Sequence, residues 1–307
     1  MSKPILVGFD PRRGDRAPVE FAVAAARFTG ARLIVVSVES GGRDADADLL
    51  VDASDVLGQV AQDIGADGIE AEFRKVKSSS AARALHELAE AQDAGLLVVG
   101  SSRRSPVGRV LLGSTAERLM HGATCPVAVV PERWQPKGSL ETIGVAYSDS
   151  DEARVALRGA HAFARRARAK LRVVTIVEHR LEMHLETEPT LAGRAERTDL
   201  EDVEGLHRVE AEKHLREVVA ELGDDVEIEV DALLGDPADV LIDLSRFMDL
   251  LVCGSRAYGP LRAVLLGSVS RRVTSEARCP VIVVPRGVEI SLEAVVADSG
   301  ETRLAAY

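Results

Sequence analysis

The segment Cys125-Pro-Val-Ala-Val-Val-Pro131 recurs, with one aliphatic exchange, as Cys279-Pro-Val-Ile-Val-Val-Pro285, 154 residues further along the chain. The same spacing relates Leu96-Leu-Val-Val-Gly100 to Leu250-Leu-Val-Cys-Gly254, and Leu111-Leu-Gly-Ser114 to Leu265-Leu-Gly-Ser268. Two earlier pairs are 138 residues apart: residues 5–10 match residues 143–148, and residues 31–38 match residues 169–176. Five collinear matches indicate that the chain contains two copies of one domain in tandem.

Within each copy, short β-branched runs alternate with segments of helical periodicity. This alternation is typical of βαβ units and of a parallel sheet that is buried on both faces. In the first copy it predicts strands near residues 4–9, 33–38, 69–76, 96–99 and 127–130, and helices near residues 15–29, 47–64, 80–92 and 114–121. We therefore expect an α/β fold made of two tandem doubly wound parallel five-stranded sheets.

Prolines and glycines mark the domain boundaries. Pro131 and Pro285 end the last strands, and residues 132–139, with Pro136 and Gly138, are typical of a linker. The prediction is a first domain over residues 1–131, a second over 140–286 and a C-terminal tail over 287–307, in which the alternation of residues 288–296 favours an extra strand. The two repeat spacings differ by 16 residues, which predicts a polar insertion around residues 186–204, as a solvated loop leading into a helix.

Composition bounds the class of protein. Of 307 residues, 46% are hydrophobic, 28% charged and 3% aromatic, which is typical of a soluble globular chain with an aliphatic core. A formal charge of -11 argues against a nucleic-acid surface, because such surfaces need clustered Lys and Arg. Three cysteines, two of them in the matching Cys-Pro steps, indicate buried strand residues in a reducing cytosol. With no signal peptide and no long apolar run, we expect a cytoplasmic location without a membrane partner.

The loops after the first and fourth strands are those that a doubly wound sheet presents to a ligand. Each fourth strand continues into a glycine loop that closes on Gly-Ser, over residues 100–115 and 254–269. Glycines let the backbone approach a ligand, and a helix opening at Gly-Ser offers free N–H groups to an anion. Each loop is therefore a candidate phosphate site. A purely structural interpretation, in which Gly100 and Gly254 end strands and Ser114 and Ser268 cap helices, stays open at this point.

Other chemistries find little support in the sequence. The P-loop lysine is replaced by Ser114, and the chain has no G-x-G-x-x-G after a strand and no G-x-S-x-G nucleophile motif. His179, His184, His207 and His214 lack the spacing of metal ligands. We therefore predict no catalytic residues and no metal site.

At these loops the sequence resembles the tandem two-domain members of the universal stress protein family, over nearly the whole chain. Nucleotide-binding members carry G-x2-G-x9-G-[ST] after the fourth strand, an Asp at the end of the first strand, and the Cys-Pro-Val-x-Val-Val-Pro ending. The resemblance implies a Rossmann-like fold of the adenine nucleotide alpha hydrolase-like type. It also implies ATP binding, with the loop around the phosphates and the ends of the first two strands at ribose and adenine.

Carried over by position, the resemblance assigns a set of binding residues to each copy. The first copy supplies Asp10, Val38, Gly100, Arg103, Gly113, Ser114 and Thr115. The second copy supplies Ala146, Ser148, Ile176, Gly254, Ala257, Gly259, Gly267, Ser268 and Val269.

Each copy departs from the family pattern at a different place. Arg103 replaces the second motif glycine of the first copy, where it would either occlude the loop or contribute a bidentate phosphate contact. In the second copy Ala257 stands at that position, and Ser148 replaces the Asp of the first strand. The second copy thus keeps the better phosphate loop, and the first keeps the better nucleoside end.

The expected function is that of a stress-response regulatory protein that binds ATP or another adenine nucleotide, more readily in the second copy. No residue requires Mg²⁺, and any ATP hydrolysis would be slow and incidental. The alternative is a domain pair that has lost nucleotide binding and acts as a protein interaction module. A nucleotidyl transferase is disfavoured because the chain has no His-x-Gly-His step. We also expect residues 126–130 and 280–284 to pair edge to edge within the chain, giving a pseudo-dimer, and two chains to form a homodimer.

Overall fold

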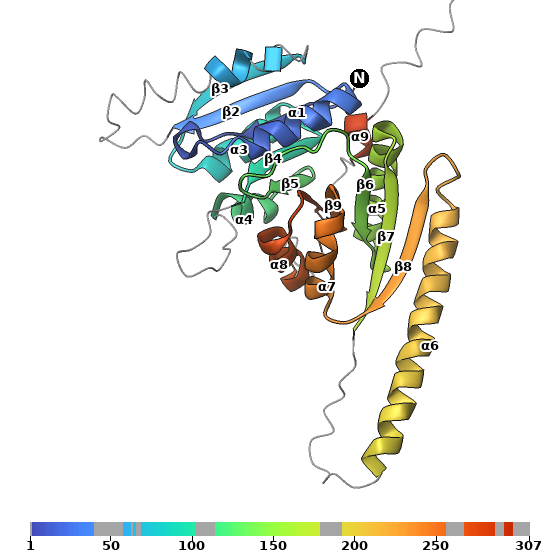
Figure 1. Cartoon of the computed structure of the whole chain (residues 1–307). Helices are drawn as coiled ribbons and strands as arrows, with labels where there is room; N and C mark the ends of the chain where they lie inside the picture. The colour runs from blue at the N-terminus through green and yellow to red at the C-terminus, as the bar shows by residue number, and fades with distance from the viewer. Residues whose placement is uncertain are drawn as a thin grey trace, which may run out of the picture.

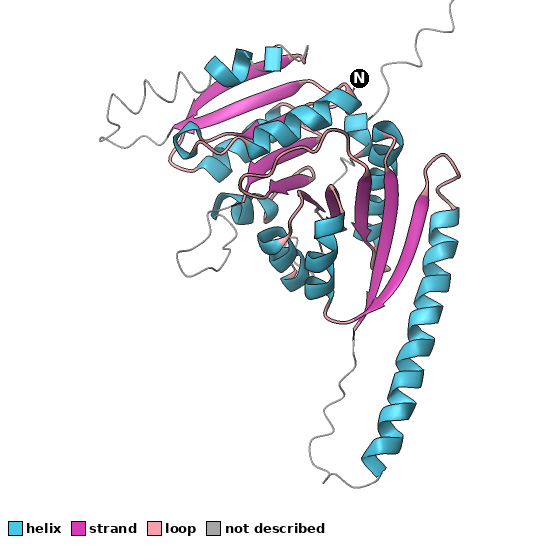
Figure 2. Cartoon of the chain, viewed as in Figure 1, coloured by secondary structure: helices cyan, strands magenta, loops and turns pink. Residues whose placement is uncertain are grey.

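The computed structural model describes residues 2–39, 58–62, 64–65, 69–101, 114–178, 192–255, 267–285 and 292–296. Over these residues the chain forms two α/β halves that share one ten-stranded sheet, with the strand order β3-β2-β1-β4-β5-β10-β9-β6-β7-β8 (Figure 1). Figure 2 shows these strands between layers of helices. The predicted α/β class and the two doubly wound halves are confirmed.

The first half contains the predicted strands in parallel pairing. Its strands are β1 (Ile5–Gly8), β2 (Leu33–Glu39), β3 (Ala71–Lys77), β4 (Leu96–Gly100) and β5 (Val127–Val130). Its helices are the 3₁₀ turn η1 (Pro11–Arg13), α1 (Ala17–Thr29), α3 (Ala81–Ala91) and α4 (Ser114–Met120). Of the predicted helix at 47–64, residues 58–62 and 64–65 are described and helical, and residues 47–57 lie outside the described residues.

The second half repeats this order. Its strands are β6 (Thr142–Ala146), β7 (Lys170–Val177), β8 (Ile228–Leu234), β9 (Leu250–Gly254) and β10 (Val281–Val284). Its helices are α5 (Asp151–Ala167), α6 (Ala192–Ala220), α7 (Pro237–Leu244), the 3₁₀ turn η2 (Ser245–Phe247) and α8 (Ser268–Glu276), followed by the short α9 (Glu293–Val296).

The two halves join through their last strands. β5 and β10 pair antiparallel, with Ala128 opposite Ile282. The predicted edge-to-edge pairing inside one chain is therefore confirmed. It leaves neither strand as an exposed sheet edge.

Side chains that alternate along each strand build a core on both faces of the sheet. Ile5 and Val7 belong to a cluster that includes α1 and α5, whereas Leu6 belongs to a second cluster with α3, α4, α7 and α8. Because both faces are covered, the strands are apolar almost throughout, as the sequence pattern required.

The insertion in the second half is helical over most of its described length. α6 runs alongside β8, and its N-terminal part projects beyond the sheet (Figure 1). Leu215 of α6 is buried against the core, whereas Leu206 is 68% exposed. Nine residues separate the two leucines, so they lie on opposite faces of the helix.

The prediction of an extra strand in the tail is wrong for the part that the structure describes. Residues 293–296 form α9, and Leu292, Val295 and Val296 are buried. Their spacing of three and four residues places them on one face of a helical turn, which decides against the alternating pattern. Residues 288–291 lie outside the described residues.

Candidate functional site

Two cavities lie at equivalent positions in the two halves. Each opens at the carboxyl ends of the strands, beside the switch point where the strand order reverses, between β1 and β4 and between β6 and β9. The first pocket, between the ends of β1, β2 and β4, has a volume of about 300 Å³. The second pocket, between the ends of β6, β7 and β9, has a volume of about 420 Å³.

The structure brings together the predicted residues of the second copy. All of those that it describes line the second pocket: Ala146, Ser148, Ile176, Gly254, Gly267, Ser268 and Val269. Ala257 and Gly259 lie outside the described residues.

The N-terminus of α8 forms one wall of the second pocket. Gly267 is its N-cap residue, and no side chain caps the helix. Ser270 faces inward and donates a hydrogen bond from Oγ to the carbonyl of Gly254 over 3.3 Å, which ties α8 to the end of β9. The first N–H groups of α8 therefore remain available to an anion in the pocket. For Ser268, which is the first helical residue and not the cap, the structural interpretation of a capping serine does not hold.

A carboxylate that the sequence comparison overlooked also lines the second pocket. Asp149 follows Ser148, and its Oδ1 accepts hydrogen bonds from Arg154 over 2.7 Å and from the hydroxyl of Tyr147 over 3.5 Å. His214 of α6 places Nε2 3.7 Å from Oδ2. The hydrogen bond from Arg154 is the main reason that the pKa of Asp149 lies below its ordinary value. The side chain is thus an ionised acceptor at neutral pH.

The remaining walls of the second pocket are mostly apolar. Leu241 of α7 and Val273 of α8 lie beside Ile176 at the end of β7, with Cys253 at the end of β9. Glu178, just past β7, adds a second carboxylate. The pocket therefore combines an apolar surface, free backbone N–H groups and two acidic side chains.

The first pocket gathers fewer of the predicted residues. Asp10, Val38, Gly100 and Thr115 line it. Ser114 begins α4 next to Thr115, but its side chain, like Arg103 and Gly113 as whole residues, lies outside what the structure describes.

Asp10 is largely occupied by its own turn. Its Oδ1 accepts from the N–H of Arg12 over 3.1 Å, and its Oδ2 lies 3.3 Å from Nε of Arg13. This carboxylate caps η1, and both of its oxygens have partners.

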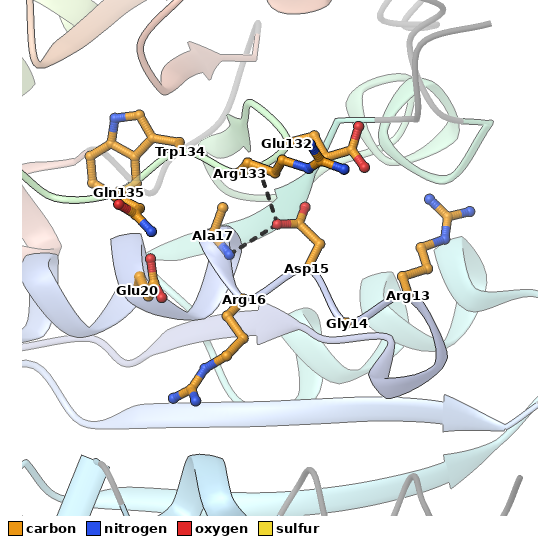
Figure 3. Close-up of a pocket in the computed structure, with 10 residues that line it drawn as sticks. All are labelled: Arg13, Gly14, Asp15, Arg16, Ala17, Glu20, Glu132, Arg133, Trp134 and Gln135. Carbon is orange, nitrogen blue, oxygen red and sulfur yellow. Dashed lines mark hydrogen bonds between the residues drawn. The ribbon is translucent and has the colours of Figure 1, made fainter. Parts of the chain in front are cut away.

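A wider cavity of about 720 Å³ adjoins the first pocket beneath the linker, with Arg13, Asp15 and Glu132 common to both (Figure 3). Asp15 lies between the linker and the start of α1, where its Oδ1 accepts from the N–H of Ala17 over 3.2 Å and of Arg133 over 3.3 Å. The N–H of Glu132 donates to Ser101 Oγ over 3.1 Å. The linker is therefore fastened along the rim of the first pocket.

Metal chemistry finds no ligand cluster among the described residues, where no three His, Cys, Asp or Glu side chains gather. His179 and His184 lie outside that part of the chain. In the part of the chain that the structure describes, none of the helices combines the length and the apolar character that a membrane span needs.

Comparison with known proteins identifies the family to which both halves belong. The model of the universal stress protein family matches residues 1–131 and 139–285. The chain belongs to the universal stress protein family. A universal stress protein of Mycobacterium tuberculosis (strain ATCC 25618 / H37Rv) is 30% identical to it over 224 residues, which are 72% of this chain and 74% of that one.

Solved structures share the arrangement of this universal stress protein. A functionally unknown protein from Pseudomonas aeruginosa PAO1 superposes with a TM-score of 0.68 at 17% identity, covering 96% of each chain. A universal stress protein from Archaeoglobus fulgidus DSM 4304 superposes with a TM-score of 0.65 at 21% identity, covering 94% of this chain and 100% of that one. At these identities the likeness is one of fold, and it extends over both halves.

Proposed function

We propose that this universal stress protein binds an adenine nucleotide such as ATP, in the second pocket in preference to the first, and that binding itself is its role in a stress response. The observation that carries the proposal is the common lining of one pocket by seven residues predicted from three separate stretches of sequence. Those stretches follow β6, β7 and β9, and only a shared ligand explains why all three are adapted at the same end of the sheet.

The chemistry of the second pocket suits the three parts of a nucleotide. The free N–H groups at the start of α8, with the helix dipole, favour the phosphates near Gly267. Ile176, Leu241 and Val273 offer an apolar surface to a planar base. Asp149 and Glu178 supply acceptors for hydroxyl and amino groups. The proposal includes no catalytic step, because binding needs none of the groups that a hydrolase would require.

The second pocket is favoured over the first for two reasons. It is the larger, at about 420 Å³ against about 300 Å³. Its loop has Ala257 where the first loop has Arg103, so a smaller side chain stands at the position that family members give to glycine. Occupation of the first pocket would accordingly be weaker.

Titration of ATP into the purified protein by calorimetry tests this proposal. Matched variants put a carboxylate at the same motif position of each copy: Gly267→Glu and Gly113→Glu. Gly267 has φ -61° and ψ 153°, which any residue adopts, so the introduced carboxylate repels phosphate without straining the backbone. We expect Gly267→Glu to weaken ATP binding at least tenfold and Gly113→Glu to leave the tight site intact.

Two outcomes would count against the proposal in different ways. Absence of ATP binding by the wild type, together with absence of released nucleotide after denaturation, would reject nucleotide binding altogether. Loss of binding in Gly113→Glu alone would move the site to the first copy.

The second candidate function is a protein interaction module that binds no nucleotide. The observation in its favour is the outer face of α6, where Val203, Leu206 and Val209 are 45%, 68% and 57% exposed. Apolar side chains in such a row on the solvent side of a helix are typical of surfaces that contact another protein. A wild type without nucleotide affinity would make this the leading function.

A further inference from the structure

Asp149 presents one carboxylate oxygen to the second pocket without a committed partner. Its Oδ1 is held by Arg154 and Tyr147, whereas among the described residues no group donates a hydrogen bond to Oδ2. The nearest charged group to Oδ2 is His214, whose Nε2 is 3.7 Å away, beyond hydrogen-bonding distance. The side chain is thus fixed through one oxygen and open at the other.

The partners of Asp149 come from three elements. Tyr147 ends β6, Arg154 belongs to the first turn of α5, and His214 belongs to α6. A carboxylate that is positioned before a ligand arrives loses little conformational entropy on binding. An oxygen so placed accepts efficiently from hydroxyl groups.

The first pocket has no equivalent oxygen. Both oxygens of Asp10 are engaged, one with the N–H of Arg12 and the other 3.3 Å from Arg13. Although Asp10 stands at the end of the first strand, it serves its own turn, and a ligand would have to break these contacts to recruit it.

We propose that Asp149 binds the ribose hydroxyls of the nucleotide in the second pocket, so that this pocket selects ribonucleotides over nucleotides without those hydroxyls. The inference rests on the proposed function and adds a binding residue to it. One carboxylate oxygen with two free lone pairs accepts from neighbouring hydroxyls of one sugar. The loss of an aspartate at Ser148 is thereby offset by the next residue along the chain.

Competition between ATP and 2′,3′-dideoxy-ATP tests the inference in the full-length protein. The wild type should bind ATP about tenfold or more tightly, which is the factor that a charge-assisted hydrogen bond supplies. Asp149→Ala should lose that factor for ATP and keep the dideoxy affinity, so the discrimination disappears. Asp151→Asn, which changes an exposed acidic residue at the start of α5, is the matched control and should keep it.

The unchanged dideoxy affinity of Asp149→Ala also reports that its pocket is folded. Equal affinities of the wild type for both nucleotides, or discrimination that persists in Asp149→Ala, would overturn the role of Asp149 while leaving nucleotide binding in place. A wild type that binds neither nucleotide would overturn the proposed function and this inference together.

Discussion

The three cysteines are protected from chemistry by their positions in the sheet. Cys125 and Cys279 precede β5 and β10, and Cys253 lies at the end of β9, where it contributes to the floor of the second pocket. Burial raises the pKa of each thiol to about 12. Since only the thiolate reacts rapidly, none of the three is a nucleophile or a redox centre at neutral pH.

This burial predicts the outcome of thiol titration. With Ellman's reagent at pH 8, the native protein should release almost no chromophore over minutes, because every thiol is both protonated and inaccessible. In guanidinium chloride the same sample should report the three cysteines of the sequence. Rapid reaction of one equivalent in the native state would contradict the buried position of Cys253.

At the same scale, sequence comparison foresaw the positions of the second pocket but not its carboxylate. In the first copy, η1 separates β1 from α1, which begins at Ala17. In the second copy, Ser150 caps α5 directly after β6. Equal residue spacing therefore does not place equivalent side chains in equivalent positions after these strands, and Asp149 was hidden behind the substitution at Ser148.

Among the elements, the linker is more firmly held than its composition suggested. Trp134, the only tryptophan of the chain, packs edge-on against Phe21 of α1, with ring centroids 5.8 Å apart. Arg133 adopts a left-handed φ of 61°, a conformation that its hydrogen bond to Asp15 stabilises. These contacts join residues 118 positions apart in the sequence, which no local pattern reveals.

Removal of the Asp15 carboxylate should release the linker. Asp15→Ala leaves the N–H groups of Ala17 and Arg133 without their acceptor, at a cost of roughly 1 kcal/mol. We expect the fluorescence emission of Trp134 to shift to longer wavelength as its ring becomes more hydrated. Glu70→Ala, near the start of β3, changes an acidic residue away from the linker and should leave the emission unchanged. An unshifted spectrum in Asp15→Ala would mean that Trp134 is held independently of Asp15.

At the scale of the whole molecule, the repeat predicted both halves and their pairing, whereas α9 was not foreseen. This helix closes against both halves: the N–H of Lys3 donates to the carbonyl of Ala294, and Leu292 packs over Gly159 of α5. Its seat needs glycine, since a Cβ on Gly159 would lie 2.6 Å from Cβ of Leu292. The repeat could not reveal this contact, because the tail has no counterpart in the first copy.

Gly159→Ala therefore has an effect whose sign depends on the tail. In the full chain, overpacking against Leu292 should cost about 1–3 kcal/mol and lower the melting temperature. In a chain that ends at residue 287, the clash is absent and the better helix propensity of alanine should raise stability by about 1 kcal/mol. Thermal unfolding of the four proteins measures both signs. The same sign in both backgrounds would refute the seating of α9 on Gly159.

The antiparallel join of β5 and β10 has a consequence for the stoichiometry of ligand binding. It reverses the strand direction between the halves, so the two pockets face opposite edges of one continuous sheet. A single nucleotide cannot bridge them, and each must fill from its own side. A second protein approaching one edge would encounter one pocket alone, which makes the chain a two-sided platform whose sides are read separately.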